Sequence, residues 1–149
     1  MAAEPKPQGY DETKYKRPSV TVDVALTTVK EGSVWLLLIQ RRDAPYRHRW
    51  ALPGGFLDVD KDADILAAAQ RELREETHFQ AGYLEQLATF GDRDRDPRTR
   101  VITVAHFALI PAEKASAQTV RGDDDAKRAE WFDWNHLPPL AFDHEKIVA

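Results

Sequence analysis

An interval without proline or glycine, from Asp62 to His78, is the feature that most constrains how this chain can fold. Residues with high helix propensity dominate the interval, so it predicts one continuous helix over about residues 62–78. Acidic residues that suit the N-terminal end of a helix stand near its start: Asp60, Asp62 and Asp64. A helix turns by about 100° per residue, which places Leu66, Ala69 and Leu73 on one stripe. We expect this stripe to face a core.

The same helix carries three carboxylates, Glu72, Glu75 and Glu76, within an arc of roughly 100°. These like charges would repel one another at neutral pH, so a cation is expected to neutralise them. Oxygen ligands in a chain without cysteine favour Mg²⁺, or Mn²⁺, over Zn²⁺. Because Mg²⁺ often shares its ligand shell with substrate phosphates, the pattern points to phosphoanhydride hydrolysis. Arg71 lies one turn before Glu75 and could hold that carboxylate in a defined rotamer.

On the helix alone, an ordinary solvated face with paired Glu and Arg residues explains this pattern equally well. The preceding turn, Pro53-Gly54-Gly55, favours the metal site, because glycine tolerates a positive φ and a close approach of the backbone to a ligand. Such a turn would let a backbone carbonyl join the metal shell and would let phosphates come close.

Several segments have the composition of β-strands. Val20 to Leu26 alternates apolar and polar residues, as a half-buried strand does. Val34 to Gln40 is a near-continuous apolar run that suits a central strand buried on both faces. Further strands are predicted at residues 83–90, 101–110 and 129–134, followed by a short helix that opens at Asp143. This order of elements predicts an α/β (α+β) fold, a mixed β-sheet sandwiched between helices.

Length and composition fit one globular domain, since 149 residues can bury a continuous core. Residues 1–17 have little to bury, so we expect a flexible N-terminal segment before a domain over residues 18–149. The net charge of -4 argues against a nucleic-acid partner bound through the overall field. We see no apolar run that would span a bilayer and no signal peptide, so we expect no membrane partner and a cytoplasmic location.

The turn and the run Arg71-Glu72-Leu73-Arg74-Glu75-Glu76-Thr77 together resemble the signature box of the Nudix hydrolases. The resemblance implies a Nudix fold and a Mg²⁺-dependent enzyme. The implied catalytic residues are Arg71, Glu72, Glu75 and Glu76. The implied metal ligands are Glu72 and Glu76, with Glu75 and the Gly55 carbonyl completing the site. The general base would be a box glutamate or an acidic residue on a later loop, where the candidates are Asp123, Asp124 and Asp125.

The chain departs from that box at two places. The turn and Arg71 are two residues further apart than usual, and Ala63 stands where an outer glutamate is expected. Asp60 or Asp62 could replace that glutamate. His78 stands where a glycine normally follows, so the helix needs another way to end. Neither change touches the inner metal ligands, so we expect activity to survive.

Arginines near the turn are candidates for binding substrate phosphates, together with the turn itself: Arg41, Arg42, Arg49, Gly54 and Gly55. Solvation at the surface explains these arginines equally well. Arginines and aspartates alternate over residues 92–98, and such mixed charge favours a structural loop. Trp50 and Phe56 could stack on a base, although packing is the commoner fate of aromatic residues. The five histidines show no ligand spacing, and we assign them no metal role.

Outside the box, residues 18–148 resemble the ADP-ribose pyrophosphatase branch of the family. The resemblance implies that a nucleotide is the substrate, with ADP-ribose hydrolysed to AMP and ribose 5-phosphate as the first reaction to expect. Two alternatives stay open. One is a pyrophosphatase that removes damaged nucleoside triphosphates. The other is a non-catalytic ADP-ribose-sensing module, as in the related repressors of NAD metabolism. The branch also implies a possible homodimer.

Overall fold

A computed structural model of the chain describes residues 2–117 and 128–149. Its elements follow one another along the chain as β1 (Ser19–Lys30), β2 (Ser33–Gln40), β3 (Trp50–Ala51), β4 (Gly54–Phe56), α1 (Ile65–Thr77), β5 (Glu85–Phe90), β6 (Val101–Ile110), α2 (Ala112–Ala117), β7 (Ala129–Asp133), the 3₁₀ helix η1 (Trp134–His136) and α3 (His144–Val148). The predicted strand over residues 101–110 has the predicted bounds. The other predicted strands differ by a few residues at their ends.

The strands of the described residues form one mixed seven-stranded sheet in which β1 is central. One edge of β1 pairs in parallel with β6 from Ser19 to Thr28. Its other edge is divided, because Thr21 to Asp23 pairs with β4 and Thr27 to Lys30 pairs with β2. The strand β1 therefore changes partners along its length, and the two glycines of the predicted turn lie within β4, beside the first half of β1. We call Pro53 to Gly55 the glycine turn.

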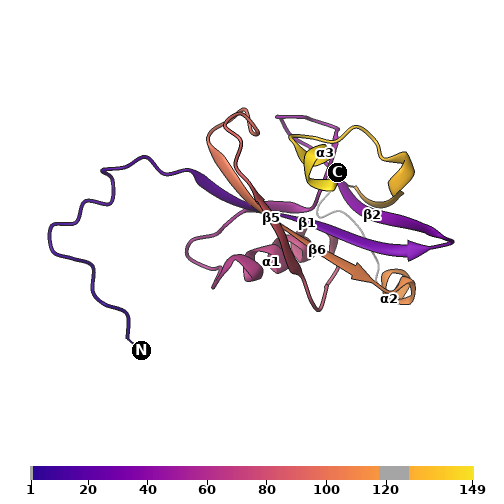
Figure 1. Cartoon of the computed structure of the whole chain (residues 1–149), viewed down its shortest axis with the longest axis horizontal. Coiled ribbons are helices and arrows are strands. Elements are labelled where there is room, and N and C mark those ends of the chain that lie inside the picture. The colour runs from indigo at the N-terminus through magenta and orange to yellow at the C-terminus, as the bar shows by residue number, and fades with distance from the viewer. Residues whose placement is uncertain (1, 118–127) are drawn as a thin grey trace.

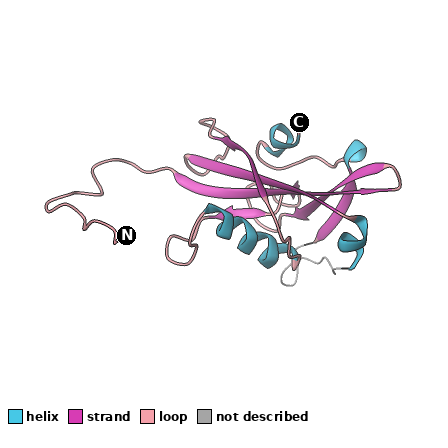
Figure 2. Cartoon of the chain, turned by 60° about the horizontal axis from the view of Figure 1, so that its bottom comes forward, coloured by secondary structure: helices cyan, strands magenta, loops and turns pink. Residues whose placement is uncertain are grey.

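Helices cover both faces of the sheet, as predicted (Figures 1 and 2). Alternating residues of β1, among them Val22 and Val24, pack with α1 in one buried cluster. Ala25 points to the other face and packs with Leu140 and Ile147, which lie in the C-terminal segment and α3. The alternation of a β-strand thus supplies both cores from a single element.

Helix α1 begins at Ile65, after Asp64, whose side chain accepts a hydrogen bond from the amide of Ala67 at 2.7 Å. This is the cap that a short acidic residue is expected to provide. The buried face of the helix is formed by Ala68, Ala69, Leu73 and Thr77. The prediction was wrong for Leu66, which is 38% exposed. The angular position of a residue predicts which side of the helix it is on, but it does not predict whether the core extends as far as the first turn of the helix, where Leu66 lies.

Helix α1 ends at His78 without the glycine of the usual box. His78 itself adopts the left-handed conformation, with φ 58° and ψ 14°, and its amide donates to the carbonyl of Arg74 at 2.8 Å. The following residue, Phe79, is fully buried and donates its amide to the Thr77 hydroxyl. Burial of the residue after the cap therefore holds a histidine in a backbone conformation that normally favours glycine.

Residues 2–18 are exposed and belong to no helix or strand, and Figure 1 shows them running away from the sheet. The division into a flexible segment and a domain stays a prediction. A separate finding concerns membranes: none of the helices in the described ranges is both long and apolar enough to cross one.

Replacing His78 by Gly should stabilise the protein, because glycine adopts a left-handed conformation without the steric cost paid by other residues. We expect a gain of about 1 kcal/mol, or a melting temperature higher by about 2–4 °C. Thermal denaturation followed by circular dichroism would measure it. His78→Ala keeps the unfavourable φ and is the control, so an equal gain in both variants would contradict the explanation.

Candidate active site

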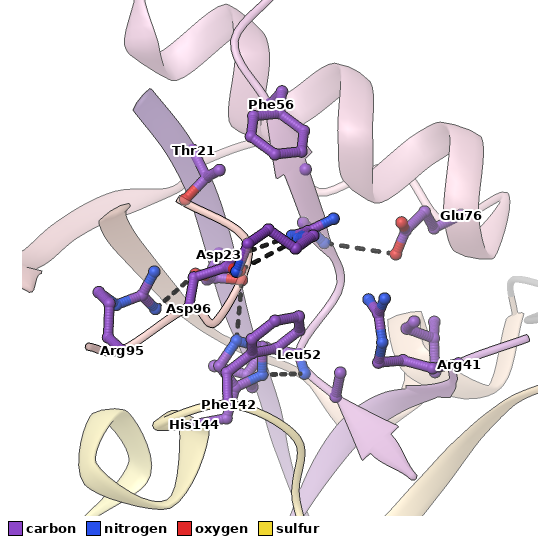
Figure 3. Close-up of a pocket in the computed structure, with 15 residues that line it drawn as sticks. Thr21, Asp23, Arg41, Leu52, Phe56, Glu76, Arg95, Asp96, Phe142 and His144 are labelled. Carbon is purple, nitrogen blue, oxygen red and sulfur yellow. Dashed lines mark hydrogen bonds and ion pairs between the residues drawn. The ribbon is translucent and has the colours of Figure 1, made fainter. Parts of the chain in front are cut away.

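A pocket opens where β1, β4 and the C-terminal end of α1 meet the segment before α3 (Figure 3). Its walls come from parts of the chain that are far apart in sequence. They include Thr21 and Asp23 of β1, Gly54 to Phe56 of β4 and Glu76 of α1. The remaining polar walls come from Arg41, Arg95, Asp96, Arg98 and His144.

The backbone of the turn lies directly against the helix that carries the carboxylates. The amide of Gly54 donates to Glu76 Oε2 at 3.3 Å. A Cβ atom placed on Gly55 would lie 2.5 Å from Glu72 Oε1, and one on Gly54 would collide with the Val22 carbonyl oxygen. Neither glycine has a positive φ. The two positions therefore require glycine because neighbouring atoms approach their backbone closely. Of the two reasons suggested by the sequence, close approach is confirmed and a positive φ is not.

Arg71 organises the carboxylates around it. Its guanidinium donates two hydrogen bonds to Asp62, at 2.7 and 2.8 Å, and one to the Phe56 carbonyl at 3.1 Å. It also donates to Glu72 at 3.0 Å and to Glu75 at 3.1 Å, so the expected Arg71–Glu75 contact is present. The hydrogen bonds from Arg71 lower the pKa of Asp62 to about 2, and Asp62 in turn raises the pKa of Arg71.

The longer spacing between the turn and Arg71 forms a compact loop. The amide of Asp58 donates to Asp62 Oδ2 at 2.8 Å, and the amides of Asp60 and Lys61 donate to Asp58 Oδ1. Asp62 thus points inward to Arg71, whereas Asp60 is exposed. Of the two candidates to replace the missing glutamate, Asp62 is the one whose side chain contacts α1, through Arg71.

The donor set on α1 fits a hard divalent cation. Glu72 and Glu76 both lie against the turn, and the side chain of Glu75 is half exposed. Within the described ranges, no three acidic or histidine side chains already converge as a ligand set. A Mg²⁺ ion needs no such cage, because it is usually held by one or two carboxylates together with waters and substrate phosphates.

Of the three arginines predicted near the turn, Arg41 lines the pocket. Its Nε donates to the Pro45 carbonyl at 2.7 Å, and its guanidinium lies 4.8 Å from the centre of the Phe142 ring. Burial, followed by repulsion from Arg98, lowers the pKa of Arg41. Arg42 and Arg49 are exposed and are not pocket-lining residues.

The charged loop over residues 92–98 was expected to be structural, and in part it is. Arg98 forms a two-point pair with the buried Asp96, and Arg95, also buried, forms one with Asp143. However, Arg95, Asp96 and Arg98 also line the pocket. The guanidinium of Arg98 lies 5.2 Å from the centre of the Phe56 ring.

Sequence reasoning missed Asp23 and His144. Asp23 was counted as a polar position of an alternating strand, but only 6% of it is exposed, and His144 was given no role. A carboxylate between two valines of the predicted half-buried strand was the one available signal. Trp50 packs edge-on against Phe132, while Phe56 lines the pocket. The general-base candidates Asp123, Asp124 and Asp125 lie outside the described residues.

Comparison with known proteins agrees with this geometry. The model of the family described as NUDIX domain matches residues 17–149. The chain is 40% identical over 141 residues to the "ADPR responsive transcriptional repressor NtrR" of Acinetobacter baylyi, covering 93% of this chain and 55% of that protein. It is 38% identical over 134 residues to an ADP-ribose pyrophosphatase of Methanocaldococcus jannaschii, covering 90% and 73%. The chain thus spans about half the length of the repressor.

A solved structure has the same fold. It is the NUDIX domain of Shewanella oneidensis NrtR complexed with ADP ribose, which superposes with a TM-score of 0.84 at 32% identity. The match covers 94% of this chain and 90% of that one.

Gly54→Ala should destabilise the protein by about 1–3 kcal/mol, because the added methyl meets backbone rather than a movable side chain. Chemical denaturation would measure the loss. Gly82→Ala is the matched control, since a Cβ there would approach only the Lys114 amino group, at 3.5 Å. Equal stability of the Gly54 variant and the wild type would contradict the packing described for the turn.

Asp62→Asn should lower stability at neutral pH, and the difference from wild type should disappear in acid. The folded pKa of Asp62, about 2, lies below its ordinary value of 3.8, so its stabilising charge is fully present above pH ~4 and is lost as the pH falls toward 2. Melting temperatures measured from pH 2 to pH 7 would show this convergence. Asp60→Asn, on the exposed side of the same loop, is the control, and a difference for Asp62→Asn that stays constant with pH would contradict the assignment.

Proposed function

The chain belongs to the NUDIX domain family, and we propose that it is a Mg²⁺-dependent hydrolase of a nucleoside diphosphate linked to another moiety, with ADP-ribose as the leading substrate. Hydrolysis of ADP-ribose at its diphosphate gives AMP and ribose 5-phosphate. The proposal includes Mn²⁺ as a possible substitute for Mg²⁺.

One observation carries the proposal: two box carboxylates, Glu72 and Glu76, lie against a turn whose backbone can approach phosphate oxygens. A divalent ion bound between these carboxylates and the diphosphate would neutralise phosphate charge and lower the pKa of a bound water. Other groups of the protein orient the carboxylates of α1. Arg71 holds Glu72 and Glu75, and Asp62 and the Phe56 carbonyl hold Arg71.

Cationic side chains of the pocket support an anionic substrate. Arg41 is half-buried and lines the pocket near Glu76 (Figure 3), and burial lowers its pKa because it disfavours the charged form. A substrate phosphate would offset that cost. Arg98 lies at the same opening beside Phe56, so cationic and aromatic surfaces adjoin there. This combination suits a phosphate attached to a ring-bearing group.

The choice of ADP-ribose rests on the relatives. Two of the sequence relatives are named for ADP-ribose or ADPR, and one structural relative was solved as a complex with ADP ribose. The repressor among them keeps a second function open, an ADP-ribose-sensing module without catalysis. The intact carboxylates of this chain favour hydrolysis over that alternative. A nucleoside triphosphate pyrophosphatase would use the same helix, so only the substrate distinguishes it. A cytoplasmic location and a homodimer stay predictions.

Purified protein with Mg²⁺ should release AMP from ADP-ribose, and Glu76→Gln should lower kcat by about 100-fold or more, because an amide is a much weaker metal ligand than a carboxylate. Chromatographic separation of the nucleotide products would measure both. Glu85→Gln, on the exposed edge of β5, should retain wild-type kcat.

A substrate panel separates the alternatives. Faster turnover of damaged nucleoside triphosphates than of ADP-ribose would assign the second enzyme activity. Tight binding of ADP-ribose by calorimetry, with no turnover of ADP-ribose, nucleotide sugars, dinucleotides or nucleoside triphosphates, would overturn the enzyme proposal and favour the sensing module.

A further inference from the structure

The C-terminal segment Leu140 to His144 runs beside Trp50 to Leu52, the residues that lead into the glycine turn. Leu140 forms a parallel bridge with Trp50, and the amide of Ala141 donates to the Trp50 carbonyl at 2.8 Å. The amide of Leu52 then donates to a side chain, His144 Nδ1, at 3.0 Å. Strand β3 ends at Ala51, so the imidazole takes the place of the next backbone acceptor.

His144 is 4% exposed, and its two partners define which tautomer a neutral ring adopts. Because Nδ1 accepts a hydrogen bond, a neutral ring carries its proton on Nε2. Nε2 lies 3.3 Å from Asp23 Oδ1, so the imidazole connects the Leu52 amide to a buried carboxylate. Asp23 Oδ2 also accepts the hydroxyl proton of Thr103 at 2.6 Å, which fixes the carboxylate between β1 and β6.

This arrangement controls one of the contacts that hold the glycine turn, whose two glycines also pair with Val22 and Asp23 of β1. The Leu52 amide is bound by His144, the Pro53 carbonyl accepts from the Val24 amide at 2.8 Å, and the Gly54 amide donates to Glu76. Only the first contact comes from the C-terminal segment. A second constraint is steric, since a Cβ on Gly54 would lie 2.7 Å from Asp23 Oδ1.

We propose that His144 and Asp23 form a positioning pair that sets the Gly54–Gly55 turn for diphosphate hydrolysis, an inference that rests on the function proposed above. His144 acts through the Leu52 amide, and Asp23 fixes the orientation and proton position of the imidazole. Neither residue takes part in the chemical step. Their effect is to place the turn at the right distance from Glu72 and Glu76, and displacements of about 1 Å at such a position can lower a rate about 100-fold.

Two amide substitutions separate the two hydrogen bonds of His144. His144→Asn places a carbonyl oxygen near the position of Nδ1, so it can still accept from Leu52 but cannot reach Asp23. His144→Gln places an amide nitrogen near the position of Nε2, so it can donate to Asp23 but offers Leu52 no acceptor. His136→Gln is the matched control, because the His136 side chain is 82% exposed.

We expect His144→Gln to lower kcat about 10- to 100-fold with KM nearly unchanged, whereas His144→Asn stays within about threefold of wild type. Melting temperatures, measured in parallel, give the folded fraction of each variant. Equal losses of kcat in the Asn and Gln variants would overturn the proposal, and so would a loss in the Gln variant that the folded fraction accounts for. A purely structural histidine predicts one of those results.

A second measurement needs no catalysis. In chelator-treated protein, NMR should show faster hydrogen exchange at the Leu52 amide in His144→Gln, together with changed shifts of the Gly54 and Gly55 amides. His144→Asn should change them less. If the wild type hydrolyses nothing in the substrate panel, the proposed function fails while these spectra still test the positioning pair. Unchanged Gly54 and Gly55 shifts in His144→Gln would overturn it.

Discussion

Contact between the backbone of the Gly54–Gly55 turn and helix α1 is the constraint on which the rest of the site depends. A methyl group at either position would collide, with the Val22 carbonyl in one case and with the Glu72 carboxylate in the other. The turn must therefore pair with β1 and contact α1 at the same time. Because α1 packs on the sheet through Ala69 and Leu73, the hydrophobic core sets the distance between carboxylates and turn.

Electrostatic order on α1 follows from one guanidinium. Carboxylates that repel one another would spread over many rotamers, but Arg71 binds Glu72 and Glu75 and is itself held by Asp62. Asp62 comes from the loop that is longer than in the usual box. The longer loop therefore brings a replacement carboxylate, Asp62, to Arg71. In this chain the replacement orients the arginine, and Glu72 and Glu76 remain facing the turn.

Much of the fold could be predicted because it depends on local pattern. The β-branched run from Val101 to Ile110 and the interval without proline or glycine before His78 each specify one element, and the close spacing of the box residues puts them on one helix. The His144–Leu52 and Asp23–Thr103 contacts join residues 92 and 80 positions apart, so no local pattern reports them. They arise only when β6 pairs with β1 and the C-terminal segment docks beside β3.

The glycine turn is consequently held from both faces of the sheet. Glu76 of α1 binds it from one side, and His144, at the start of α3, binds the residue that precedes it from the other. The cluster around Leu36, Leu52 and Ile147 keeps α3 in place, so packing far from the carboxylates helps to position the turn. Helix α1 and the C-terminal segment are therefore coupled through a few backbone atoms. We therefore expect a substitution in either core to displace the glycine turn and to leave the carboxylates of α1 present.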